Sequence, residues 1–106
     1  MAQRCRVIIS PAVTSELAEI YAYIERDSPQ NASAMISALV DAIDSLEILP
    51  QRHPVYRGKR QPSEAVRRMP VPPYLIYYRV NEPHLAVDIL RVRHGARRQP
   101  RRFNDD

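Results

Sequence analysis

A chain of 106 residues with a formal net charge of +4 has room for one domain, and folding should bury about two-thirds of the surface that the unfolded form exposes. Apolar residues make up 44% of the chain and charged residues 26%, which is ordinary for a globular protein and argues against wholesale disorder. A single cysteine, Cys5, excludes an intramolecular disulfide, and the apolar run 7–9 is too short for a signal peptide or a membrane span, so we expect a cytoplasmic protein.

Residues 4–9 predict a short strand, with Cys5, Val7 and Ile9 on one face. Ser10-Pro11 then predicts the start of a helix, because Ser is a preferred N-cap and Pro is favoured at the first helical position. Apolar residues follow at helical spacing and form one stripe, namely Val13, Leu17, Ile20, Tyr21 and Ile24. The acidic residues of this helix lie mostly off the stripe.

Ser28-Pro29 repeats the cap and marks a second helix, which Pro50 limits. Its apolar stripe consists of Ala32, Met35, Ile36, Leu39, Val40, Ile43 and Leu46. Because the link between the two helices is so short, they should form an antiparallel hairpin. Each stripe needs a cover, and we expect the strands to supply it.

Residues 51–63 are polar and without a period, which predicts a loop, and residues 64–69 predict a second short strand. Residues 73–98 read as a hairpin of two β-rich arms around the turn 81–84, ended by Gly95. Pro70, Pro72 and Pro73 should lie in a turn or at strand ends. We predict an α+β fold: an N-terminal strand, an antiparallel helical hairpin and a three-stranded antiparallel meander, in one mainly antiparallel sheet. One domain should span residues 1–98, followed by a basic tail over 99–106.

Charge is divided unevenly along the chain. Residues 1–50 hold three Arg and seven acids, a net charge of −4, whereas residues 51–106 hold thirteen Lys or Arg and five acids, a net charge of +8. The second half therefore favours a phosphate-rich target or an acidic protein. Fifteen of the sixteen basic residues are Arg, which suits bidentate recognition, although a genome rich in G and C gives the same bias.

The candidate binding residues lie in or just after the hairpin: Arg79, Arg91, Arg93, His94, Arg97 and Arg98. Alternate residues of a strand share a face, so Arg91 and Arg93 should project together and His94 to the other side unless the strand has ended. If Arg79 shares their face, the guanidinium groups could hold a phosphate, and a nearby His could donate a proton for metal-free RNA cleavage. Alternatively, the arginines are a solvated face or a site for an acidic partner. No cofactor or metal site is predicted, since the three histidines are scattered and the chain has two glycines.

An ordered set of segments resembles the ParE/RelE superfamily, the toxins of bacterial type II toxin-antitoxin modules, often named plasmid stabilisation proteins. The resemblance covers residues 5–98 and is closer to ParE; its segments are Ser10-Pro11-Ala12-Val13, Ile20-Tyr21-Ala22-Tyr23-Ile24, Ser28-Pro29-Gln30-Asn31-Ala32, Asp41-Ala42-Ile43-Asp44-Ser45-Leu46, Tyr74-Leu75-Ile76-Tyr77-Tyr78-Arg79-Val80 and Ile89-Leu90-Arg91-Val92-Arg93-His94-Gly95-Ala96-Arg97. It implies a toxin that a cognate antitoxin neutralises in a hetero-oligomeric complex, with an acidic or amphipathic antitoxin segment in the basic groove.

Two activities follow from the resemblance. ParE-like members poison DNA gyrase, which is the activity that we expect here, without a catalytic set. RelE-like members cleave ribosome-bound mRNA without metal; carried over to this chain, that activity would use Arg68 and Arg79 as phosphate contacts, His94 as general acid and, more weakly, Glu64 as base. The chain departs from the nuclease pattern because Lys59 is its only lysine and His94 is followed by Gly95 rather than a Tyr. We also expect a groove between the helical hairpin and the sheet.

Overall fold

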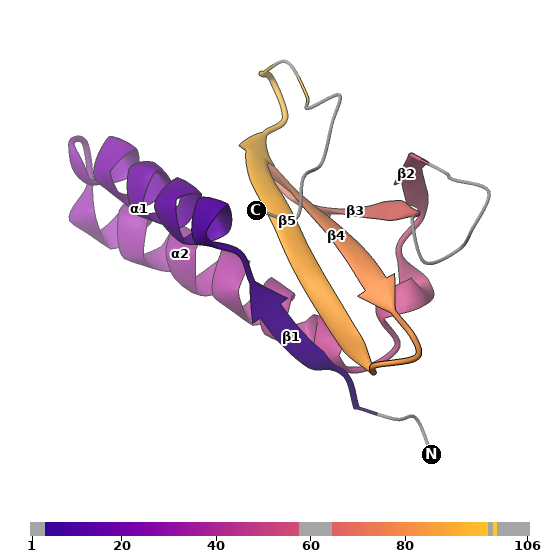
Figure 1. Ribbon diagram of the computed structural model, residues 1–106. Helices are drawn as coiled ribbons and strands as arrows, with labels where there is room; N and C mark the ends of the chain where they lie inside the picture. Colours follow the sequence, from indigo (N-terminus) through magenta and orange to yellow (C-terminus); the bar gives the residue numbers. More distant parts are fainter. Residues whose placement is uncertain (1–3, 58–64, 98, 100–106) are drawn as a thin grey trace.

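Two helices pack on one face of a five-stranded sheet (Figure 1), in a computed structural model that describes residues 4–57, 65–97 and 99. The elements in chain order are β1 (Arg6–Ile9), α1 (Pro11–Glu25), α2 (Pro29–Asp44), the single 3-10 turns η1 (Ser45–Glu47) and η2 (Pro50–Arg52), β2 (Val55–Arg57), β3 (Val66–Val71), β4 (Tyr74–Asn81) and β5 (Ala86–His94). The strand order is β1-β5-β4-β3-β2, with β1 parallel to β5 and every other neighbour antiparallel. The predicted α+β fold is confirmed.

Both helices begin at the predicted caps. The Ser10 hydroxyl accepts a hydrogen bond from the Val13 amide at 3.2 Å, and the Ser28 hydroxyl accepts one from the Asn31 amide at 3.2 Å, each followed by Pro at the first helical position. These bonds satisfy amides that a helix start otherwise leaves without partners. The helical hairpin is therefore specified locally, before any contact with the sheet.

The main core lies between the helices and the sheet. Its fully buried members include Val13 of α1, Leu39 and Ile43 of α2, and Ile76, Tyr78 and Ile89 of the central strands. Cys5, which precedes β1, and Val7 of β1 pack against this core, as predicted, but Ile9 is 41% exposed. The reason is that β1 is an edge strand, so its far end lies at the border of the sheet.

Two strands differ from the prediction. β2 occupies residues that were predicted as a loop, because a run of only three strand residues after Pro54 is too short to show a period. β3 runs later than predicted, over Val66–Val71, and includes Pro70, which pairs with Leu75 close to the end of the strand. The predicted start of that strand at Glu64 lies outside the described residues.

The central hairpin forms as predicted, but its connection between β4 and β5, residues 82–85, lies one residue later than the predicted turn 81–84. Its register shifts between Tyr77 and Tyr78, which pair with Arg91 and Ile89, so Leu90 is an extra residue and forms a bulge. Gly95 ends β5 as predicted: its amide donates to the Pro73 carbonyl at 2.8 Å, and a Cβ there would lie 3.2 Å from the same oxygen. A side chain at this position would require the Pro73 carbonyl to shift by a few tenths of an ångström, so glycine fits this close approach best.

Candidate functional site

Four arginines of β3, β4 and β5 lie on the side of the sheet away from the helices, whereas Arg67 of β3 pairs with Tyr78 of the main core and lies on the other side. Residues directly opposite in neighbouring strands share a face, and the register pairs Tyr77 with Arg68 on one side and with Arg91 on the other, while Arg93 pairs with Leu75. Arg79 lies two residues beyond Tyr77 and so projects to the same side. We call this the helix-free face and define it by six residues: Arg68, Leu75, Tyr77, Arg79, Arg91 and Arg93. The structure therefore places Arg79 on the same side of the sheet as Arg91 and Arg93, with Asp88 directly opposite Arg79.

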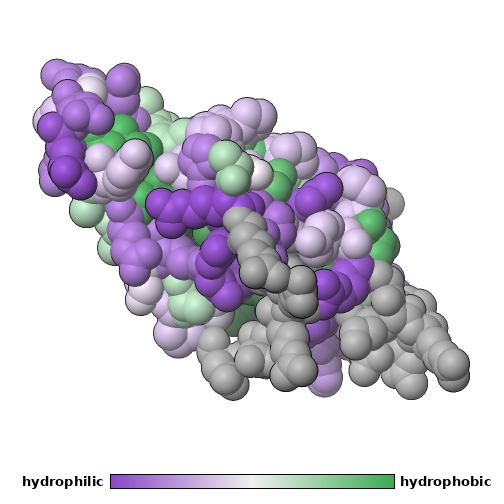
Figure 2. Space-filling view, turned by 90° about the horizontal axis from the view of Figure 1, so that it is seen from above, coloured by the Kyte–Doolittle hydropathy of each residue, from purple (hydrophilic) through white to green (hydrophobic). Residues whose placement is uncertain are grey.

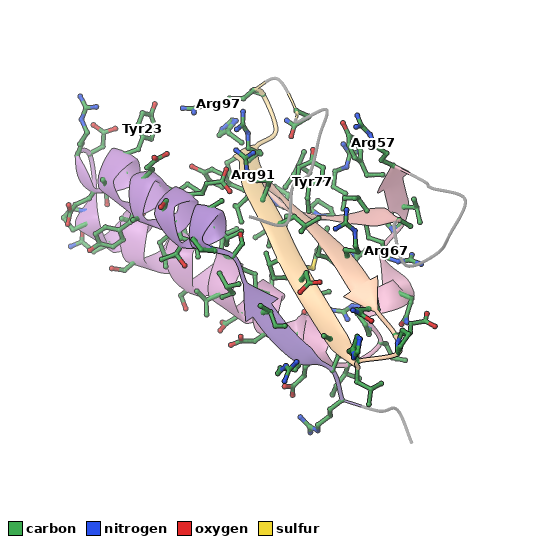
Figure 3. All side chains as sticks on the ribbon, in the orientation of Figure 1. Tyr23, Arg57, Arg67, Tyr77, Arg91 and Arg97 are labelled. Carbon is green, nitrogen blue, oxygen red and sulfur yellow. The ribbon has the colours of Figure 1, made fainter. Side chains whose placement is uncertain are left out.

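Two tyrosines interleave with these arginines. The rings of Tyr56 and Tyr77 meet edge to face with centroids 5.0 Å apart, and the guanidinium carbon of Arg68 stands 4.6 Å above the Tyr56 ring. Tyr77 is fully buried and forms a small second core with Val66 and Leu90, against which Tyr56 packs. Figure 3 shows Tyr77 between Arg91, at the end of β5, and Arg57 of β2. The face thus combines guanidinium groups with the partly exposed ring of Tyr56, which suits recognition of a macromolecule.

The Tyr77 hydroxyl is held as a hydrogen-bond donor. It donates to Oε1 of Gln99 at 2.5 Å, while Nε2 of Gln99 donates to the carbonyls of His94 at 3.1 Å and Arg97 at 2.6 Å. Burial raises the pKa of Tyr77, and the nearby Arg68 and Arg93 only partly oppose that rise. The phenol therefore stays protonated at neutral pH and is a poor base. Sequence reasoning missed Gln99, because a single polar residue of a basic tail carries no periodic signal.

His94 lies on the opposite side of the sheet. It pairs with Tyr74, a residue of the main core, and the two rings meet edge to face at 5.3 Å. Its Nδ1 accepts a hydrogen bond from the Ala96 amide at 3.0 Å. The structure therefore separates His94 from Arg68 and Arg79, although the nuclease hypothesis needs all three together.

The remaining predicted residues fall at the end of β5. Arg97 is exposed and follows the strand, whereas Arg98 and the weaker candidate Glu64 lie outside the described residues. Among residues 4–57, 65–97 and 99, no three His, Cys, Asp or Glu side chains are grouped to hold a metal ion. In the same part of the chain, no helix combines the length and apolar character that crossing a membrane requires.

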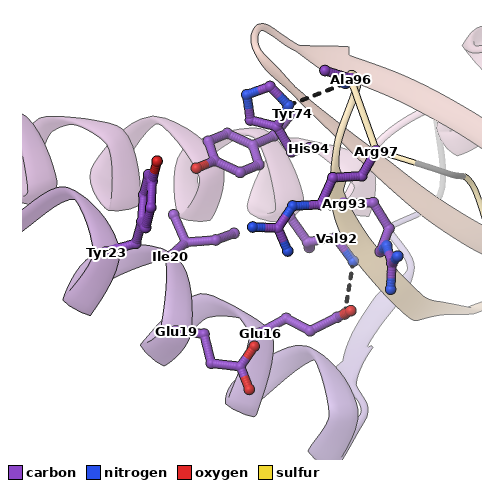
Figure 4. Close-up of a pocket in the computed structure, with 10 residues that line it drawn as sticks. All are labelled: Glu16, Glu19, Ile20, Tyr23, Tyr74, Val92, Arg93, His94, Ala96 and Arg97. Atoms are coloured by element: carbon purple, nitrogen blue, oxygen red, sulfur yellow. Dashed lines mark hydrogen bonds between the residues drawn. The ribbon is translucent and has the colours of Figure 1, made fainter.

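A groove opens between α1 and the end of β5, as expected between the helical hairpin and the sheet (Figure 4). It encloses about 500 Å³, and its lining residues are Glu16, Glu19, Ile20, Tyr23, Tyr74, Val92, Arg93, His94, Ala96 and Arg97. We call it the α1–β5 groove. Acidic residues from α1 form one wall and basic residues from β5 the other, over an apolar floor. Seen from above, this end of the molecule is largely hydrophilic, with hydrophobic side chains exposed in between (Figure 2).

Glu16 crosses from the helix to the sheet beside this groove. Its Oε2 accepts from Nε of Arg91 at 2.9 Å and lies 2.8 Å from the second guanidinium nitrogen, and its Oε1 accepts from the Val92 amide at 2.9 Å. One of the predicted binding arginines, Arg91, is thus engaged by an internal acid. The sequence placed Glu16 off the apolar stripe, and nothing local could show a contact across 75 residues.

The comparisons with known proteins agree with this architecture. A family model described as "ParE toxin of type II toxin-antitoxin system, parDE" matches residues 7–99. Comparison with curated protein sequences gives no match.

Three solved structures share the fold. The chromosomal ParDE toxin-antitoxin system from P. aeruginosa has a chain with 19% identity and a TM-score of 0.66, covering 86% of this chain and 96% of that one. A chain of the RelBE2 toxin-antitoxin complex from Mycobacterium tuberculosis has 22% identity and a TM-score of 0.64, covering 90% of this chain and 95% of that one. A chain of the archaeal RelE-RelB complex from Pyrococcus horikoshii OT3 has 19% identity and a TM-score of 0.66, covering 91% of this chain and 100% of that one.

Proposed function

The chain belongs to the ParE toxin family of type II toxin-antitoxin systems, whose model matches residues 7–99, and from this premise we propose that it acts by inhibiting DNA gyrase. It does so by binding, through the helix-free face, and not by cleaving RNA. The observation that carries the proposal is the opposite placement of His94 and of the arginines Arg68 and Arg79 on the two sides of the sheet.

Cleavage of RNA through the 2′-hydroxyl requires a proton acceptor and a proton donor within hydrogen-bond reach of the reacting phosphate. Beside Arg68 of the helix-free face lie the phenols of Tyr56 and Tyr77, and burial raises the pKa of Tyr77. Such a phenol donates a hydrogen bond well and accepts a proton poorly at neutral pH. The face is therefore better suited to gripping a partner than to proton transfer.

A cognate antitoxin is the second partner in this proposal. It neutralises the toxin by occupying the α1–β5 groove, whose apolar floor includes Ile20 and Tyr74 and whose rim carries Arg93 and Arg97. Tyr23 stands beside it with 63% of its surface exposed, which suits an aromatic residue that a partner covers. The two partners then use surfaces that meet at Arg93, which belongs to both, and the toxin works in the cytoplasm, where gyrase acts.

A ribosome-dependent endoribonuclease of the RelE kind is the second candidate function. The cluster of Arg68, Tyr77 and Arg93 favours it, because guanidinium groups and a phenol donor together could hold a phosphate. In that case Tyr77 would act as the hydrogen-bond donor in place of His94.

Purified gyrase separates the two candidates. With the toxin in excess, we expect the loss of DNA supercoiling and the accumulation of protein-linked DNA breaks, while mRNA in a reconstituted translation reaction stays intact. Normal supercoiling together with cleavage of ribosome-bound mRNA would replace gyrase inhibition by the nuclease. Because Tyr77→Phe removes only the donor, it should abolish cleavage if the nuclease operates and leave gyrase inhibition within about threefold otherwise.

A further inference from the structure

β1 is an edge strand whose outer side is open. Figure 1 shows it as the outermost strand, beside β5, and in the described part of the chain no strand pairs with its other side. The Arg6 amide donates to the Leu85 carbonyl at 2.7 Å, toward β5. Because successive amides of a strand point to alternate sides, those of Val7 and Ile9 point outward. Such exposed backbone groups are a template for another strand.

The open stretch is short and has defined ends. On its N-terminal side, the Cys5 amide also points outward, but it donates to the Glu47 carbonyl at 2.7 Å. On its C-terminal side, Pro11 begins α1 and has no amide to offer. A strand that pairs with this edge therefore pairs with residues 7–9.

Exposed apolar side chains gather around this stretch. Five of the eight large apolar residues that are exposed in the described part of the chain lie in β1 or beside it: Ile8, Ile9, Ile48, Leu49 and Leu85. Leu49 and Leu85 also line a hollow of about 400 Å³ together with Cys5, and both have a left-handed backbone, with φ of 49° and 48°. Strained residues and contiguous apolar surface are typical of interaction sites.

The charges beside β1 argue against an acidic partner or a nucleic acid. Arg4 forms an ion pair with Glu47, so its charge is already compensated. Glu82 lines the hollow, and Asp88 pairs with Ile8 on the neighbouring strand. This edge also belongs to the half of the chain whose net charge is −4. The partner that it fits is a short, apolar strand, and the toxin itself carries one.

Residues 7–9 are complementary to themselves. In an antiparallel pair centred on Ile8, Val7 of one copy lies opposite Ile9 of the second copy, so that both outward amides of each copy find a carbonyl. The two Ile8 side chains meet at the twofold axis, as a self-complementary contact requires. Arg6 lies opposite Ser10 of the second copy, which keeps the two arginines apart.

We propose that two copies of the toxin join antiparallel through the outer sides of β1, centred on Ile8, and so extend two five-stranded sheets into one. The twofold axis of such a pair is perpendicular to the sheet, so both helical hairpins lie on one side and both helix-free faces on the other. The dimer presents two arginine faces in the same direction and binds its target at two points. The proposal holds whichever target the toxin has.

The first test is disulfide trapping in full-length toxin that carries Cys5→Ala. Adding Ile8→Cys places two thiols in a non-hydrogen-bonded antiparallel pair, whose Cα atoms lie about 4.5 Å apart, within the range of a disulfide. Mild oxidation should therefore link the two copies. Arg6→Cys in the same background is the matched control, because its thiols would lie about 14 Å apart along the strands and should stay reduced. Absence of a link in the Ile8→Cys variant, or equal linkage in both variants, would overturn the proposal.

The second test is sedimentation equilibrium of the isolated, full-length toxin. Wild type should associate to twice the monomer mass as its concentration rises. Ile8→Lys brings two ammonium groups together at the axis and should raise the dissociation constant about tenfold or more. Val40→Lys is the matched control, since Val40 is 37% exposed and Ile8 40%, and should change the constant less than twofold. A monomer at every concentration, or equal weakening by both variants, would contradict the proposal.

Amide hydrogen exchange shows which edge pairs and does not depend on a variant that folds. Exchange at Val7 and Ile9 should slow as toxin concentration rises, while the amides of β2, at the other edge of the sheet, should not change. Slowing at these two amides only after antitoxin is added would assign the edge to the antitoxin and refute the dimer.

Two outcomes separate this proposal from the proposed function. A strictly monomeric toxin that still inhibits gyrase would refute the dimer and leave the proposed function standing. A toxin that dimerises through β1 but leaves supercoiling normal would support the dimer and refute gyrase inhibition.

Discussion

Arg68→Ala should cost this protein far more in target binding than in stability. Arg68 stands above the Tyr56 ring at 4.6 Å on a half-buried position of β3, so its loss removes one cation–π contact worth about 1 kcal/mol. For a domain of this size that lowers the melting temperature by about 4–8 °C. A hydrogen bond from the guanidinium to a charged group of the target contributes about 1.5–3 kcal/mol. Inhibition of gyrase should therefore need about ten- to a hundredfold more toxin.

The assay pairs a thermal melt with a titration of gyrase supercoiling. Arg26→Ala is the matched control, because it removes the same charge from the exposed C-cap of α1, on the helical side of the molecule. It should leave the inhibitory concentration within about twofold, since an exposed charge at a distance is largely screened. A folded Arg68→Ala variant that inhibits as well as the Arg26→Ala control would refute the assignment of the helix-free face to the target.

Three further predictions concern stability. Leu39 is fully buried, so Leu39→Ala should lower the free energy of unfolding, measured in urea, by about 2–5 kcal/mol. The neighbouring Val40 is exposed, so Val40→Ala should lower it by less than about 1 kcal/mol, and similar losses in the two variants would contradict the packing of α2. Burial and the charge of Arg52 lower the pKa of His53 from 6.5, so protonation favours the unfolded chain: wild type should lose stability as the pH falls below 6.5, and His53→Asn should lose less over the same range. The pKa of Tyr77 is raised above 10.0, so its contribution to stability is complete below pH 10 and is lost as the pH rises through the raised value. Tyr77→Phe should therefore lose less stability than wild type at alkaline pH. Parallel curves of unfolding free energy against pH for the two proteins would show that the residue is not buried as described.

The helical hairpin and the central hairpin could be predicted because their signals are local. Ser10 and Ser28 are followed by Pro at the first helical position, and the apolar stripes of both helices recur at the helical period. The hairpin arms are rich in β-branched and aromatic residues. Each of these signals lies within one short stretch of sequence, so the helices and the hairpin could be located without knowing any contact between distant residues.

The remaining features depend on residues that are distant in the chain. The bulge at Leu90 follows from the register between β4 and β5 and turns Leu90 toward Tyr77. The contact of Glu16 with Arg91 joins a helix to a strand, and that of Tyr77 with Gln99 joins a strand to the tail. The sequence could predict the arginine face by alternation, but not which arginine an internal acid would engage.

The most direct test of the two-surface account places a photoreactive benzophenone side chain at one of two tyrosines. Tyr56 packs against Tyr77 and Arg68 beside the helix-free face, Tyr23 lines the α1–β5 groove, and both lie at or near the surface. The account predicts that toxin labelled at position 56 crosslinks to gyrase and toxin labelled at position 23 crosslinks to the antitoxin. Crosslinking to gyrase from position 23 alone would contradict it, because the target would then bind beside α1 and not the arginine face of the sheet.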